Sequence, residues 1–91
     1  MNRQELERAQ GHSVNNRKEL ERSRTCGCYH CESVFPPGSV LRWIDKSRTE
    51  AEWTALCPQC GIDAVIGDTA GFGVGPVFLH AMNKRWFSDS R

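Results

Sequence analysis

The sequence lacks any long apolar run, and it has no apolar segment directly behind its first residues. No stretch approaches the roughly 20 apolar residues that a membrane-spanning helix needs. A secretory signal would place an apolar segment of about 7–15 residues close to the N-terminus, where residues 1–12 are mostly polar. We therefore expect a cytoplasmic protein without a membrane partner.

An excess of charge of one sign is also missing, because 12 Lys and Arg residues face 11 Asp and Glu residues, for a net charge of +1. A general polyanion binder carries a clear basic excess, so composition does not indicate that class. Nucleic-acid binding stays open as an alternative, through a basic face with aromatic stacking platforms. The candidate cations are Arg22, Arg24, Arg42, Lys46 and Arg48, and the candidate platforms are Tyr29, Trp43 and Trp53.

Apolar residues are scarce for a folded chain, at 38% of 91 residues with a mean hydropathy of −0.56. A domain of this size hides only about 60% of the surface that its unfolded chain exposes. Small domains of this kind commonly need a disulfide or a metal to stabilise them. The composition therefore predicts one small domain with such a cross-link.

Cysteine is the residue that the chain has in unusual number, with five copies, four of them in two C-x-x-C pairs. Cys28 and Cys31 form the first pair, Cys57 and Cys60 form the second, and 25 residues separate the pairs. Two residues between thiols let the backbone curl so that both sulfurs reach one ion at about 2.3 Å. The spacing predicts one structural Zn²⁺ per chain, held by Cys28, Cys31, Cys57 and Cys60. Iron at the same four sulfurs, disulfides and a redox use of the thiols are the weaker alternatives.

The residues around the two pairs differ. Gly61 follows the second pair and permits the positive φ that such a turn requires, whereas Glu32 stands at the equivalent place after the first pair. We therefore expect the first turn to be built differently. Cys26 is expected to be a buried or half-buried free thiol near the site, although it could replace Cys28 as a ligand, and His30 is expected to be exposed.

The rest of the chain divides by composition. We expect residues 1–12 to be a flexible appendage, because Leu6 and Ala9 offer little apolar area to offset the entropy of ordering the chain. A short helix is expected near 15–23, with Asn15 or Asn16 as its cap. Val40–Ile44 fits a strand or a helical turn, and strands are expected at 53–57 and 62–66. Pro76 can open a helix over 76–87, in which Phe78, Met82 and Trp86 recur at i,i+4.

These elements predict a small α+β fold: zinc-ribbon-like β-hairpins stapled by a four-cysteine metal site, with a short N-terminal helix and a C-terminal helix packed on the ribbon. The domain should span residues 13–87, with a polar tail at 88–91.

Several of these motifs together resemble a known family. The runs are Cys26–Cys31, Phe35–Pro37, Trp43–Asp45, Thr54–Gly67 and Trp86–Phe87, and they are similar to those of small uncharacterised bacterial proteins labelled "cytoplasmic protein". The resemblance covers roughly residues 12–87 and is most specific over 54–67, but the family usually carries two aromatics where this chain has Tyr29 and His30. It implies a bacterial zinc-ribbon-like protein, carries over no activity, and makes residues 1–11 an appendage.

For function, a protein-interaction module (an adaptor, inhibitor or immunity-type binder) with another protein as partner is the leading interpretation. Four thiolates would close the metal site, and Cys26 has no identifiable base beside it, so we expect no enzymatic activity and no small-molecule substrate.

Overall fold

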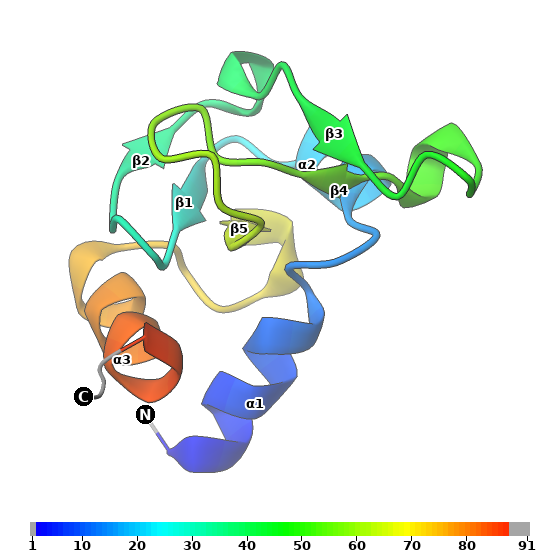
Figure 1. Cartoon of the computed structure of the whole chain (residues 1–91). Coiled ribbons are helices and arrows are strands. Elements are labelled where there is room, and N and C mark those ends of the chain that lie inside the picture. The colour runs from blue at the N-terminus through cyan, green and yellow to red at the C-terminus, as the bar shows by residue number, and fades with distance from the viewer. Residues whose placement is uncertain (1, 88–91) are drawn as a thin grey trace.

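The computed structural model of the protein describes residues 2–87, so the polar tail predicted at 88–91 lies outside the described residues. It has the small α+β architecture that the sequence predicts (Figure 1). The helices are α1 (Arg3–Gly11), α2 (Arg17–Glu21) and α3 (Pro76–Phe87), and the strands are β1 (Cys26–Cys28), β2 (Val34–Phe35), β3 (Trp43–Ile44), β4 (Thr54–Ala55) and β5 (Val65–Gly67). Within residues 2–87, no helix combines the length and the apolar character needed to cross a membrane.

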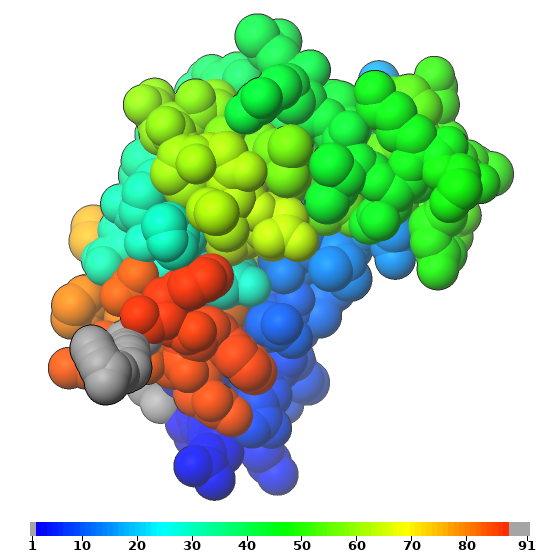
Figure 2. All heavy atoms as spheres, in the orientation of Figure 1, coloured from blue at the N-terminus to red at the C-terminus, as the bar shows by residue number. Residues whose placement is uncertain are grey.

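The strands form two small antiparallel sheets. In the first, β1 lies between β2 and β5, with Cys26 opposite Phe35 on one side and Gly67 on the other. In the second, β3 pairs with β4, and Trp43 lies opposite Ala55. Val40–Ile44 thus contributes a strand only at its end. The β3–β4 hairpin and the loop that joins its strands stand out from the body of the molecule (Figures 1 and 2).

Helix α3 has the bounds that the sequence predicts, and it packs against the three-stranded sheet. Its side chains Phe78, Leu79 and Met82 are buried, and Trp86 is half-buried. Leu79 lies so close to β1 that a Cβ on Gly27 would come within 2.9 Å of its methyl groups. The C-terminal helix is therefore part of the core.

Helix α1 occupies the segment for which the sequence predicts a flexible appendage, residues 1–12. Asn2 caps it in a capping box with Glu5, and Leu6 and Ala9 are buried in the common core. Figure 1 shows α1 beside α3, and Glu7 accepts a 2.9 Å hydrogen bond from Arg85 of α3. The structure differs from the expectation because Leu6 and Ala9, although few, are both buried in the common core.

Helix α2 is shorter than the helix predicted at 15–23, and the side chain of Asn16 makes no cap hydrogen bond. The buried Asn16 instead connects three parts of the chain. Its Nδ2 donates to the carbonyls of His12 (2.9 Å) and Val65 (2.8 Å), and its Oδ1 accepts from the backbone N–H of Ala55 at 3.2 Å. This amide fixes α2 between β4 and β5.

Candidate metal centre

The two cysteine pairs converge on one point in the structure, as their spacing predicts. The Sγ atoms of Cys28 and Cys60 are 3.7 Å apart, as are those of Cys31 and Cys57, and all four lie within 4.8 Å of one another. A tetrahedral zinc with Zn–S distances near 2.3 Å would place its sulfurs about 3.8 Å apart. The four sulfurs can therefore hold one tetrahedral metal ion with little rearrangement.

Each pair lies in a turn, and the two turns have the same hydrogen bonds. We call residues 28–33 the first cysteine turn and residues 57–62 the second. In each, the leading cysteine donates its N–H to the carbonyl five residues on: Cys28 to Ser33 and Cys57 to Ile62, both at 3.0 Å. The carbonyl of Cys28 accepts from Glu32 at 2.7 Å, and that of Cys57 accepts from Gly61 at 2.9 Å.

The same correspondence extends to the sulfur atoms. The backbone N–H of His30 points at the Sγ of Cys28 at 3.4 Å, and the N–H of Gln59 points at that of Cys57 at 3.3 Å. Such donors stabilise the negative charge of a thiolate, which is the form that binds a metal.

The prediction of a different first turn is wrong. Glu32 has φ +64° and Gly61 has φ +80°, so both occupy the left-handed region at equivalent places. For a residue with a Cβ this conformation costs about 1–2 kcal/mol. In this conformation the N–H of Glu32 bonds to the carbonyl of Cys28, and the Glu32 carboxylate faces His80 of α3 at 3.3 Å.

The four sulfurs differ in their surroundings. Cys28 and Cys57 are buried, Cys60 is half-buried and Cys31 is exposed. Burial raises the pKa of Cys28 and of Cys60 above the ordinary thiol value. Burial acts in the same direction on Cys31, but hydrogen bonds with the side chain and backbone of Ser33 outweigh it and lower its pKa to about 7. The raised pKa values of Cys28 and Cys60 disfavour their thiolate forms, and a divalent cation would supply the missing stabilisation.

Helix α3 contacts the first cysteine turn through Asn83 and Phe87. The side-chain amide of Asn83 donates to the carbonyls of Tyr29 and His30, at 3.1 and 2.8 Å. The ring of Phe87 lies 5.7 Å from that of Tyr29 and 4.7 Å from that of His30, which is exposed as predicted. Nothing in the sequence pattern singles out Asn83, because its role depends on the packing of two distant segments.

A shallow groove lies beside the second cysteine turn. It has a volume of about 190 Å³, and its walls include Leu41, Arg42, Leu56 and Pro58, with Cys57 between them. Leu41 is 82% exposed. The groove therefore presents apolar surface next to the metal centre.

The fifth cysteine stays apart from the other four. Cys26 is fully buried in β1 and does not belong to the converging group. Burial, with a smaller effect of Asp68, raises its pKa to about 12. Cys26 is thus a buried thiol, as the sequence predicts, and a poor nucleophile.

The aromatic platforms proposed for nucleic-acid stacking are occupied by the protein itself. Tyr29 is buried, with its hydroxyl 3.1 Å from that of Ser13, so it offers no face to the stacking that the nucleic-acid alternative requires. The guanidinium of Arg17 lies about 5 Å from the ring centroids of both Trp43 and Trp53, at 5.0 and 4.9 Å. The ammonium of Lys46 lies 4.9 Å from the Trp53 ring. Each tryptophan ring is thus already in contact with a cation of the protein.

No family model, no curated protein and no solved structure matches this chain. The resemblance to the bacterial family stays an expectation, and the interpretation of the site depends on its own geometry.

Proposed function

We propose that the protein is a zinc-ribbon-like interaction module of the cytoplasm, in which Cys28, Cys31, Cys57 and Cys60 hold one structural Zn²⁺. The sulfur–sulfur distances of 3.7 Å support the metal, because they are close to the edges of a zinc–thiolate tetrahedron. Four thiolates leave no open coordination position for a substrate, which favours a structural role over catalysis. Zinc is preferred to iron because a structural role needs no redox activity.

Such an ion would dominate the stability of the fold. Structural zinc in finger-like peptides contributes roughly 10–16 kcal/mol at neutral pH, whereas whole domains have net stabilities of about 5–15 kcal/mol. With its low apolar content, the protein should fold only when the metal is bound. The ion would thereby fix the groove beside the second cysteine turn.

The single observation that carries the interaction role is this groove. Its apolar surface comes from Leu41, Leu56 and Pro58. Arg42, which also lines the groove, has no acidic partner among residues 2–87. The groove therefore fits a protein segment that brings one apolar side chain and a neighbouring carboxylate. Arginine is one of the residues enriched among those that contribute most to protein–protein affinity.

The test compares two substitutions at equally exposed apolar residues. Leu41 and Val77 are 82% and 81% exposed, but Val77 lies on α3, away from the groove. Immobilised wild type, Leu41→Asp and Val77→Asp would be incubated with extract of the source cells. We expect at least one protein to bind wild type and Val77→Asp but not Leu41→Asp. If all three forms retain the same proteins, the groove is not the interaction site.

Salt dependence distinguishes this role from the nucleic-acid alternative. Contacts to phosphates release counterions, so their affinity falls steeply as salt rises, whereas an apolar interface loses much less. A nucleic acid that binds in a strongly salt-dependent way, and equally well to Leu41→Asp, would favour the alternative.

A further inference from the structure

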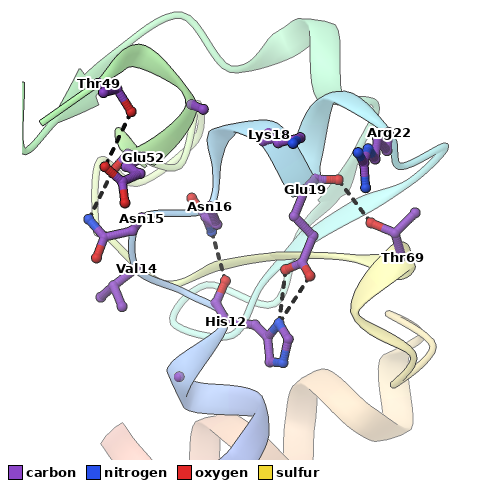
Figure 3. A pocket seen from close by; sticks show the side chains of 12 residues that line it. His12, Val14, Asn15, Asn16, Lys18, Glu19, Arg22, Thr49, Glu52 and Thr69 are labelled. Atoms are coloured by element: carbon purple, nitrogen blue, oxygen red, sulfur yellow. Dashed lines mark hydrogen bonds and ion pairs between the residues drawn. The ribbon is translucent and has the colours of Figure 1, made fainter.

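A second cavity lies on another part of the surface, between the α1–α2 junction, the segment 49–52 and Thr69 (Figure 3). Its volume is about 710 Å³, and none of its lining residues is one of the four cysteines. Small-molecule sites usually have volumes of about 300–1,000 Å³. The cavity is large enough for a metabolite and is separate from the metal centre.

The acidic groups at this cavity already have partners in the protein. The carboxylate of Glu19 points at His12, with its oxygens 3.0 and 3.1 Å from Nδ1 (Figure 3). Glu52 accepts from the Thr49 hydroxyl at 3.2 Å, and its other oxygen lies 3.9 Å from Arg48. Both carboxylates are thus engaged by groups of the protein itself.

The two cations at the cavity, Lys18 and Arg22, have no such partners among residues 2–87. Lys18 and Arg22 lie one turn apart, on α2 and at its end, and both line the cavity (Figure 3). Both side chains are exposed, and within residues 2–87 neither forms an ion pair or a side-chain hydrogen bond. The cavity therefore combines two free positive charges with walls whose acids are engaged.

We infer that this cavity binds a small molecule bearing a phosphate group, with Arg22 and Lys18 as the phosphate ligands. The planar guanidinium of Arg22 can donate two parallel hydrogen bonds to phosphate oxygens, and the ammonium of Lys18 adds a point charge. Asn15 and Thr69 also line the cavity, but their side chains already donate to the carbonyls of Glu52 and Glu19, so the two cations would supply the main contacts. The site is independent of the proposed metal and interaction roles, so its failure would leave both unaffected.

The experiment titrates inorganic phosphate, and then glucose 6-phosphate, into the metal-loaded full chain at constant ionic strength. Backbone amide resonances are followed by NMR. We expect saturable shifts confined to the residues around Lys18 and Arg22, and tighter binding of the sugar phosphate than of inorganic phosphate. Glucose without the phosphate should cause no saturable shift.

Two double variants with the same change in net charge make the test specific. Lys18→Ala with Arg22→Ala should weaken binding of both probes by about tenfold or more, since two charge-assisted contacts are lost. Arg3→Ala with Arg8→Ala removes two cations from α1, which do not line the cavity, and should leave affinity unchanged. Well-dispersed spectra would show that both variants fold.

Three outcomes would overturn the inference. The shifts could fail to saturate, they could spread over the whole surface, or the two double variants could lose affinity equally. The last two results would show a diffuse response to charge instead of a site.

Discussion

Replacing Leu6 by alanine tests whether α1 belongs to the folded domain. Leu6 is 8% exposed and belongs to the core cluster, and Ala9 in the same helix is fully buried. Leu→Ala substitutions in cores cost about 2–5 kcal/mol. Leu6 lies near the edge of the core, where neighbours can partly fill the space, so we expect a loss of about 2 kcal/mol. Alanine is itself the best helix former, so the loss would report packing and not helix propensity.

The assay is thermal or urea unfolding of the metal-loaded protein. For a domain of 60–100 residues, each kcal/mol lowers the melting temperature by about 4–8 °C, so Leu6→Ala should melt about 8–16 °C below wild type. Leu41→Ala is the matched control, because that leucine is 82% exposed. It should change the free energy of unfolding by no more than about 0.5 kcal/mol.

A Leu6→Ala protein as stable as Leu41→Ala would refute this reasoning. Helix α1 would then contribute nothing to the stability of the domain. Residues 1–12 would be the flexible appendage that their composition predicts, and the domain would begin at residue 13.

The remaining predictions concern the metal centre and one close packing contact. Asn83→Ala should lower the free energy of unfolding by about 1–2 kcal/mol and weaken zinc binding, because two hydrogen bonds that hold the first cysteine turn are lost. Competition with a chelator measures this, and an unchanged zinc affinity would show that α3 does not support the site. Gly67→Ala should cost about 1–3 kcal/mol in urea unfolding, since its Cβ would overlap the Ser23 hydroxyl and approach Leu20 to 2.9 Å. Gly11→Ala is the control, because a Cβ there meets nothing within 4 Å, and it should leave the free energy of unfolding unchanged or raise it by as much as about 1 kcal/mol. Equal effects at the two glycines would contradict the close packing at Gly67. Cys26→Ser should copurify with its metal while Cys57→Ser loses it, as elemental analysis would show, because only Cys57 belongs to the converging group. A Cys26→Ser protein that purifies without metal would show that Cys26, and not Cys28, is the first ligand.

The features that local chemistry determines could be predicted from the sequence. The C-x-x-C spacing brings two thiols together within each turn, and this was enough to predict that four cysteines would converge. Helix α3 also follows from local signals, because Pro76 opens it and apolar residues recur at helical spacing.

The features that depend on distant contacts could not be predicted in this way. Helix α1 has few apolar residues, and only the position of α3 shows that Leu6 and Ala9 are buried. The carboxylate of Glu32 faces His80 of α3, 48 residues further along the chain, and no local pattern indicates that contact. Likewise, the sequence indicates only a surface charge at Arg17, whereas the fold brings its guanidinium close to the rings of both Trp43 and Trp53.

X-ray absorption at the zinc edge of the purified, metal-replete protein tests the central claim most directly. The four converging sulfurs predict a bound zinc surrounded by four sulfur atoms at about 2.3 Å, with no nitrogen or oxygen ligand. A sample without zinc, or a zinc with a mixed shell of sulfur and lighter atoms, would contradict the four-thiolate structural site.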